Sequence, residues 1–146
     1  MKTSMPNVTI YTDGACFGNP GPGGWGALLR SGKHERVVSG GEIDTTNNRM
    51  ELRAALEALR TLTEPCSVTL YTDSNYLKKG VTEWMPNWKR RNWRRKGGKL
   101  ANVDLWKKLD EEISRHDIEW HWVRGHAGNR MNERVDRIAK KAIPTC

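Results

Sequence analysis

Hydrophobic positions follow two patterns along the chain, short runs of β-branched and aromatic residues and longer stripes at helical spacing. The short runs have the composition of β-strands. They predict strands at residues 7–13, 25–31, 35–43, 67–72 and 118–123. A tight turn near Ser31-Gly32-Lys33 joins the second and third runs, so the first three strands are expected to form an antiparallel meander.

The hydrophobic period becomes helical from Asn48 to Leu62, where the residues are strong helix formers. Thr45 and Thr46 offer an N-cap for this helix. A helix between two strands is the crossover of a βαβ unit, which joins parallel strands. Further helices are predicted at residues 74–82, 103–115 and 132–142. The elements predict one α/β domain of three layers over residues 1–146.

Residues 14–24 separate the first two predicted strands and are rich in Gly and Pro. This composition predicts an irregular loop, which lets the backbone approach a ligand at the end of the first strand. Residues 124–129, Arg-Gly-His-Ala-Gly-Asn, form a similar loop after the last strand. A single histidine is more often structural than catalytic, but His126 lies between glycines and is therefore expected to move.

The first and fourth strands carry nearly the same phrase, Val-Thr-Ile-Tyr-Thr-Asp at 8–13 and Val-Thr-Leu-Tyr-Thr-Asp at 68–73. If these strands are parallel neighbours, Asp13 and Asp73 meet at the carboxyl edge of the sheet, where open α/β sheets place their sites. Two close carboxylates repel each other, and a hard divalent cation bound by oxygen ligands offsets that cost. The alternative is two unrelated aspartates that cap strand ends.

Two further acids fall near the same edge, Glu51 in the first turn of its predicted helix and Asp136 early in the last helix. The helix dipole favours an acid in a first turn in any case, so Glu51 also has a structural explanation. A site built only from oxygen ligands selects Mg²⁺ or Mn²⁺ over zinc. Two such ions about 4 Å apart activate a water and stabilise the leaving oxygen in phosphodiester hydrolysis.

The net charge of +8 is concentrated in residues 78–99, which hold nine basic side chains against the single acid Glu83, while the remainder is neutral. We call residues 78–99 the basic segment. Such a patch indicates docking of a polyanion, although it could be only a solvated face. Trp84, Trp88 and Trp93 lie within it; they either hold the segment on the body or offer flat surface to sugars and bases. Together, acids and patch indicate a metal-dependent nuclease.

Composition and cysteine spacing indicate where in the cell the protein is expected to occur. Mean hydropathy is −0.77, and no apolar run is long enough to span a membrane. The three cysteines show no CxxC spacing, and the N-terminus has no signal-peptide pattern. These features predict a cytoplasmic protein without a disulfide framework, zinc site or membrane segment.

Several ordered motifs resemble those of the bacterial type 1 ribonuclease H family over nearly the whole chain. They are Tyr-Thr-Asp-Gly-Ala-Cys at 11–16, Gly-Asn-Pro-Gly-Pro-Gly-Gly at 18–24, Thr-Thr-Asn-Asn-Arg-Met-Glu-Leu at 45–52, Thr-Asp-Ser at 72–74, Asn-Val-Asp-Leu-Trp at 102–106 and Gly-His-Ala-Gly-Asn at 125–129. The resemblance implies a ribonuclease H-like fold, a five-stranded mixed β-sheet flanked by helices. It also implies an endonuclease that hydrolyses the RNA strand of RNA/DNA hybrids with two Mg²⁺ ions, or Mn²⁺ as a substitute, leaving 5′-phosphate and 3′-hydroxyl ends. We expect the protein to be a monomer.

The resemblance also assigns roles to residues. The metal-binding acids of the family match Asp13, Glu51, Asp73 and Asp136, and its mobile histidine, thought to assist product release, matches His126. Positions near the substrate backbone match Cys16, Asn19, Thr46, Asn47, Asn48 and Asn75. Position 75 is often Gln in the family, and the shorter Asn75 reduces the reach of this side chain toward the minor groove of the hybrid. The basic protrusion that grips the DNA strand matches the segment with Trp84, Trp88, Lys89, Arg90, Arg91 and Trp93.

Two other classes of protein share parts of this pattern. Transposase or integrase cores and resolvases also cluster acids on such a sheet, but they lack the run at 45–51 and a basic protrusion after the fourth strand. A hybrid-binding module without catalysis is expected to have lost an acid, whereas all four acids are present in this chain.

Overall fold

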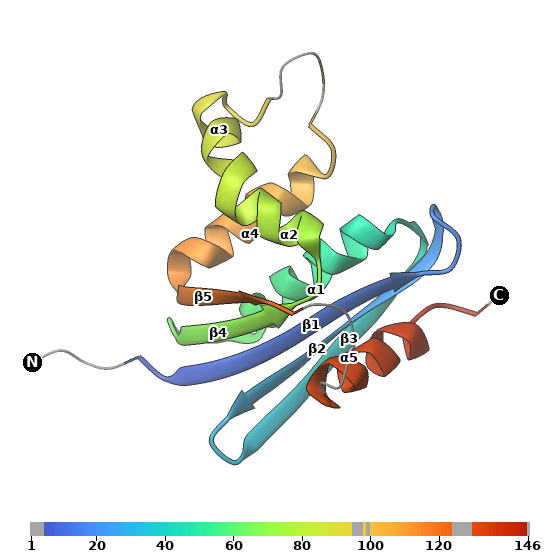
Figure 1. Cartoon of the computed structure of the whole chain (residues 1–146), viewed down its shortest axis with the longest axis vertical. Coiled ribbons are helices and arrows are strands. Elements are labelled where there is room, and N and C mark those ends of the chain that lie inside the picture. The colour runs from blue at the N-terminus through green and yellow to red at the C-terminus, as the bar shows by residue number, and fades with distance from the viewer. Residues whose placement is uncertain (1–4, 95–97, 99, 124–129, 146) are drawn as a thin grey trace, which may run out of the picture.

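The computed structural model describes residues 5–94, 98, 100–123 and 130–145. Its centre is a five-stranded mixed sheet of strand order β3-β2-β1-β4-β5 (Figure 1). The strands are β1 (Asn7–Cys16), β2 (Gly21–Ser31), β3 (His34–Thr45), β4 (Ser67–Thr72) and β5 (Asp117–Trp122). The first three form the predicted antiparallel meander, and β4 lies parallel to both β1 and β5. The sequence-based prediction of a mixed α/β sheet is confirmed.

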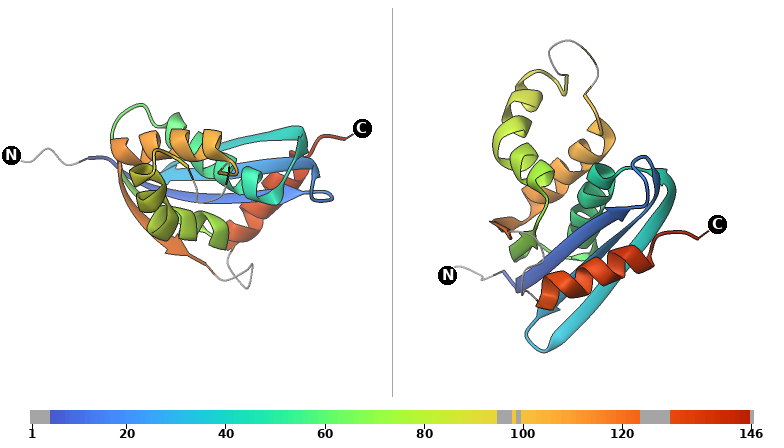
Figure 2. Two further views of the ribbon diagram at one scale, coloured as in Figure 1. Left: turned by 90° about the horizontal axis from the view of Figure 1, so that it is seen from above. Right: turned by 45° about the vertical axis from the view of Figure 1, so that its right-hand side comes forward.

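Helices cover both faces of this sheet. The helices α1 (Asn47–Thr61) and α4 (Val103–Arg115) lie on one face, and α5 (Arg130–Lys141) lies on the other (Figures 1 and 2). Alternate residues of the two central strands are buried in the core, among them Ile10 of β1 and Leu70 of β4. They pack in one cluster with the buried leucines of α1, and each such side chain contributes about 1.5–3 kcal/mol by leaving water.

The repeated phrase lies in register across the centre of the sheet. Thr9 pairs with Thr69 and Tyr11 with Tyr71, and the two tyrosine rings stack with centroids 4.9 Å apart. Because both strands run in the same direction, the aspartate two residues after each tyrosine comes to the same edge. The local repeat in the sequence therefore places Asp13 and Asp73 as neighbours.

The Gly-rich segment after β1 differs from the expected irregular loop. β1 continues to Cys16, and β2 begins at Gly21, so that Gly24 pairs with Ala15 in the ladder. Glycine is required there because α5 lies directly on the strand: a Cβ at Gly24 would be 2.2 Å from the carbonyl oxygen of Ala139. The glycines that suggested a loop instead allow a helix to touch the sheet backbone.

The predicted helix at 74–82 is also wrong in its extent. The chain forms α2 (Asn75–Lys79), a π-helical turn η1 (Gly80–Trp84) and α3 (Met85–Arg90), which together project beyond the sheet (Figure 1). A Cβ at Gly80 would lie 2.0 Å from the Trp106 indole, so the backbone of the turn packs against that ring. This contact with α4 holds the base of the projecting segment.

An aromatic cluster joins this segment to α4. The rings of Tyr76, Trp84, Trp88 and Trp106 meet with centroid separations of 5.3–5.8 Å. The hydroxyl of Tyr76 accepts a hydrogen bond from the Trp106 indole N–H at 3.2 Å.

Among the described residues, no helix has the length and hydrophobicity needed to cross a bilayer.

Candidate active site

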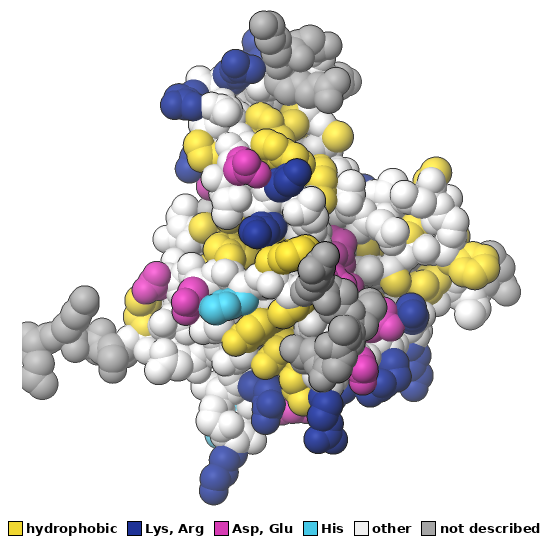
Figure 3. All heavy atoms as spheres, in the orientation of Figure 1, with side chains coloured by type: hydrophobic (Ala, Val, Ile, Leu, Met, Phe, Trp, Pro, Cys, Tyr) yellow, Lys and Arg dark blue, Asp and Glu magenta, His cyan; other side chains and the backbone are white. Residues whose placement is uncertain are grey.

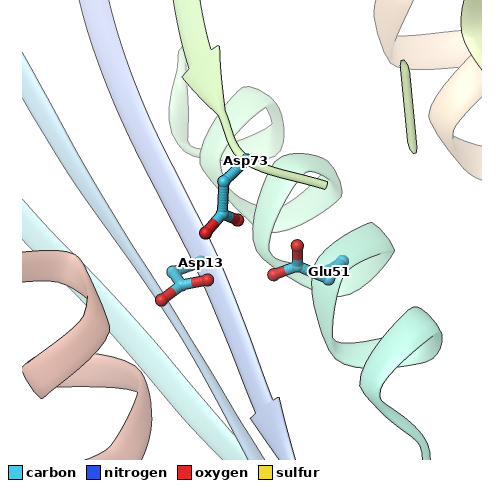
Figure 4. A group of neighbouring side chains, drawn as sticks. All are labelled: Asp13, Glu51 and Asp73. Carbon is cyan, nitrogen blue, oxygen red and sulfur yellow. The ribbon is translucent and has the colours of Figure 1, made fainter. Parts of the chain in front are cut away.

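Three carboxylates meet just beyond the point where the parallel pairing of β1 with β4 ends. Asp13 comes from β1, Asp73 from the residue after β4, and Glu51 from α1 (Figure 4). One oxygen from each lies within 4.8 Å of the corresponding oxygens of the other two. The side chains point toward one another, as the sequence predicted for these three residues.

The start of α1 brings Glu51 to this point. The hydroxyl of Thr46 caps the helix by accepting the Arg49 N–H at 3.2 Å, which confirms Thr46 as the N-cap, whereas Thr45 is the last residue of β3. The helix begins one residue earlier than predicted, at Asn47, so Glu51 lies beyond the first turn. Gly14 lies directly against the helix, because a Cβ there would be 2.5 Å from the Glu51 nitrogen.

The electrostatics of the cluster are those of acids that lie close together and are partly removed from water. The pKa of Asp13 is raised to about 7, first by burial, then by the charge of Asp73 and by the hydrogen bond and charge of Asp136, while a hydrogen bond with Glu51 lowers it. Burial also raises the pKa of Glu51 well above its usual value, followed by the charges of Asp13 and Asp73. Among the described residues, the buried Oε1 of Glu51 has no hydrogen-bond partner.

These residues fit a hard divalent cation. An ion between the three carboxylates would offset their repulsion and give the buried Glu51 oxygen a cation to bind. The donors are carboxylate oxygens, which suit Mg²⁺ and Mn²⁺.

The carboxylates line a cavity of about 520 Å³ that also brings together several residues predicted to bind substrate. Its wall includes the fourth acid, Asp136, and the predicted residues Cys16, Asn47, Asn48 and Asn75. Asn19 lies beside this group, because its side-chain oxygen accepts the Asn47 N–H at 3.1 Å. The structure therefore gathers acids and amides in one place, while their contacts with a substrate stay predictions.

Two residues at the site were not singled out from the sequence. Lys140 lines the cavity, and its Nζ lies 3.1 Å from an Asp136 carboxylate oxygen. Its position four residues after Asp136 in a predicted helix was the signal available. Trp122 donates its indole N–H to the main-chain oxygen of Asp73 at 3.2 Å. No sequence pattern predicts that contact, since it depends on how β4 ends.

Within the described part of the basic segment, Lys78 and Lys79 belong to α2 and Lys89 and Arg90 to α3, and Figure 3 shows Lys and Arg side chains at the surface of the part that projects beyond the sheet. Arg90 and Arg91 are exposed, whereas Lys89 forms an ion pair with Asp110 at 3.2 Å. Trp88 and Trp93 are partly buried against the core. Trp84 is also half-buried, so anchoring and substrate contact remain compatible. His126 lies outside the described residues.

The fold and the carboxylate cluster together define a nuclease of the ribonuclease H-like class. The chain belongs to the ribonuclease H family, whose model, RNase H, matches residues 5–144. It is 59% identical over 140 residues to a ribonuclease H of Hahella chejuensis, with 95% of each chain covered. A ribonuclease H of Bordetella bronchiseptica is 58% identical over 137 residues, covering 93% of this chain and 88% of the relative.

A solved structure agrees with this assignment. The crystal structure of LC9-RNase H1, described as a type 1 RNase H with the type 2 active-site motif, has a TM-score of 0.89 and 37% identity, covering 98% of this chain and 74% of that one. The family, fold and enzyme class predicted from the sequence are confirmed. A transposase-like core and a module without catalysis are no longer needed as explanations.

Proposed function

We propose that this ribonuclease H hydrolyses the RNA strand of RNA/DNA hybrids at the carboxylate pocket, using two divalent ions, and leaves 5′-phosphate and 3′-hydroxyl ends. Mg²⁺ is the proposed ion and Mn²⁺ a substitute. The observation that carries the proposal is the group of Asp13, Glu51 and Asp73, which each have an oxygen within 4.8 Å of an oxygen of the other two. The buried Oε1 of Glu51 also has no hydrogen-bond partner among the described residues.

The acids have distinct positions for this task. Asp13 and Asp73 extend from neighbouring strands and Glu51 from α1, so three separate elements fix one set of ligands. Asp136 approaches from α5, on the opposite face of the sheet from α1, and completes the set. When bound, the ions supply an activated water and stabilise the leaving oxygen. His126 is proposed to assist release of product.

The amides are proposed to recognise the sugar. Asn47, Asn48 and Asn75 line the same cavity as the acids, and an amide can both donate to and accept from a 2′-hydroxyl. A site built to bond a hydroxyl rejects a sugar that lacks one, because its polar groups are then unpaired. Asn19, Thr46 and Cys16 extend this contact along the strand.

The basic segment is proposed to hold the DNA strand. Lys89, Arg90 and Arg91 supply positive charge, and the exposed parts of Trp84, Trp88 and Trp93 supply flat apolar surface. Ion release from the phosphates favours such binding at low salt. The protein is further proposed to act as a monomer in the cytoplasm.

A cleavage assay tests the proposal. Labelled RNA/DNA hybrid, duplex DNA and duplex RNA of one sequence are incubated with protein and Mg²⁺, with EDTA as control. We expect cleavage of the RNA strand in the hybrid alone and none in EDTA or with Asp13→Asn. Equal cleavage of duplex DNA, or near wild-type cleavage by Asp13→Asn at any Mg²⁺ concentration, would refute the assignment.

A further inference from the structure

The main chain at Asp73 is held at the point where the β4–β5 ladder ends. The last pair in the register joins Thr72 to Trp122, and the N–H of Val123 donates to the Thr72 oxygen at 2.9 Å. Asp73 follows outside the strand. Its carbonyl oxygen accepts from the indole N–H of Trp122 at 3.2 Å, so a side chain extends the hydrogen bonding by one residue.

Hydrogen bonds also hold the residue after Asp73. The N–H of Ser74 donates to the Thr72 hydroxyl at 3.0 Å, and the Ser74 hydroxyl caps α2 by accepting the Leu77 N–H at 3.0 Å. The hydrogen bond from the Trp122 indole to the Asp73 carbonyl therefore joins the segment between β4 and α2 to the edge strand β5. The three links together define the direction in which Asp73 leaves the strand.

The exposure of Trp122 supports a role beyond packing. Trp120 and Trp122 share one face of β5, and Trp120 packs against the core, whereas Trp122 is 43% exposed. The Lys78 ammonium lies 5.1 Å from the centroid of the Trp122 ring. The ring thus contacts α2 on one side, while its N–H holds Asp73, the residue before the N-cap of this helix. Both contacts keep an exposed indole in one place.

The charge of the pocket makes such a restraint useful. A carboxylate oxygen of Asp73 lies within 4.8 Å of an oxygen of Asp13 and of one of Glu51, so these groups repel one another when no cation lies between them. That repulsion favours movement of Asp73 away from the cluster, because it is the acid that lies outside regular structure. A hydrogen bond to its main chain opposes this movement without neutralising the carboxylate.

We infer that Trp122 is a positioning residue for Asp73. The indole N–H of Trp122 holds the main chain of Asp73 and so keeps its carboxylate in place to bind metal. The inference rests on the proposed function of the pocket but concerns a residue outside the carboxylate set. It also gives one end of β5 a role at the site, although no β5 side chain lines the described cavity wall.

The test compares Trp122→Phe with Trp120→Phe. Phe at 122 keeps an aromatic ring for Lys78 and removes the N–H, whereas Phe at 120 removes core packing from the same face of the same strand. Binding of Mn²⁺ to the substrate-free protein is measured by titration calorimetry, kcat and KM are measured on hybrid, and thermal midpoints are measured in EDTA.

For Trp122→Phe we expect Mn²⁺ affinity and kcat each to fall about three- to tenfold, as the loss of one hydrogen bond gives, with KM for hybrid within about twofold of wild type. Its midpoint in EDTA should remain close to wild type. Trp120→Phe should lower the midpoint and leave Mn²⁺ affinity unchanged. Lys78→Met, which keeps the indole N–H, should also leave Mn²⁺ affinity unchanged.

Wild-type Mn²⁺ affinity in Trp122→Phe would overturn the inference, and so would an equal loss of affinity in Trp120→Phe, which would indicate general loosening. Both outcomes are separate from failure of the proposed function. That failure appears in Asp13→Asn, which would then keep its cleavage activity whatever the behaviour of Trp122→Phe.

Discussion

The Nζ of Lys140 lies 3.1 Å from a carboxylate oxygen of Asp136, one turn earlier on α5. If Asp136 binds metal as proposed, a metal ion and this ammonium compete for the same carboxylate. Because the lysine side chain is 65% exposed, the pair is screened, and we expect Lys140→Met to raise Mn²⁺ affinity of the substrate-free protein only about two- to fivefold.

Lys141→Met is the matched control for that change. Lys141 is the next residue and equally cationic, but it lines a different cavity, with Val37 and Ile138. Its replacement should leave the calorimetric Mn²⁺ affinity at the wild-type value. A fall in affinity in Lys140→Met would show that the lysine assists metal binding and does not compete with it.

Replacement of single acids should separate catalysis from stability. Asp13→Asn, Glu51→Gln and Asp73→Asn should each reduce Mg²⁺-dependent cleavage by roughly 10²-fold or more, because each removes an ion ligand. In EDTA, the thermal midpoint should stay level or rise, because one repelling charge is lost. A lower midpoint in all three variants would indicate that these acids stabilise the fold.

The metal-free protein should become less stable as pH rises toward and through 7 on account of Asp13. Its folded pKa is raised to about 7 from an ordinary value of 3.8, so between these values the folded state holds a proton that the unfolded state releases. The contribution of protonated Asp13 to the stability of the folded state is complete below the unfolded pKa and is lost as pH rises through the folded pKa. The difference in thermal midpoint between wild type and Asp13→Asn, in EDTA from pH 5 to 8, should therefore change in favour of Asp13→Asn with rising pH.

The comparison with a variant is needed because another group titrates in the opposite sense. Burial lowers the pKa of His116, so the stability that the neutral side chain contributes is lost as pH falls below the usual histidine value. Arg49 lowers the pKa of Asp104 to about 2, so the contribution of Asp104 is lost only well below the range of the measurement. A midpoint difference that does not change with pH would contradict the raised pKa of Asp13.

Neutralising Lys89, Arg90 and Arg91 together should raise KM and flatten the salt dependence of hybrid binding, by roughly one unit of log–log slope for each phosphate that the variant no longer neutralises. Turnover at saturating substrate should change little. Arg90 and Arg91 should account for most of the effect, because Lys89 is already paired with Asp110. Neutralising the exposed Lys107 and Lys108 of α4 is the control, and an unchanged KM and slope in the triple variant would make the basic segment a solvated face.

Recognition of RNA should require several sugars in a row. The four asparagines proposed to read 2′-hydroxyls come from the β1–β2 connection, α1 and α2 and lie in or beside one cavity, and we expect successive nucleotides to share them. We expect a DNA duplex with one ribonucleotide to be cut poorly and a run of about four to be cut well, with Asn48→Ala reducing activity on such runs. Duplexes with one, two, three, four and six ribonucleotides test this. Efficient cutting at a single ribonucleotide would show that one sugar contact suffices.

Local patterns in the sequence were sufficient for much of the fold. The repeated phrase at 8–13 and 68–73 predicted strands β1 and β4 and the meeting of Asp13 with Asp73. Two strands of nearly the same sequence that run in the same direction pair residue for residue, so their final aspartates become neighbours. The helix boundaries at 103–115 were also predicted correctly. Those elements are decided by residues that lie close together in the chain.

The errors occurred where distant residues decide the local structure. Gly24 belongs to a strand because β1 supplies its hydrogen bonds and α5 requires the space. Gly80 begins a π-helical turn beside Trp106, which is 26 residues later in the chain. The link from Trp122 to Asp73 depends likewise on the end of a sheet ladder. Periodicity contains no information on such contacts.

The contact of α5 with Gly24 has a consequence for how the pocket can vary. The same helix carries Asp136, and it lies so close to β2 that even a methyl group at Gly24 would overlap the Ala139 carbonyl. Any larger residue there must lift the helix, and with it one of the four acids, away from the other three. The width of the pocket is thus limited from beneath by a residue without a side chain, and a substitution at Gly24 can disable the nuclease while every acid remains unchanged.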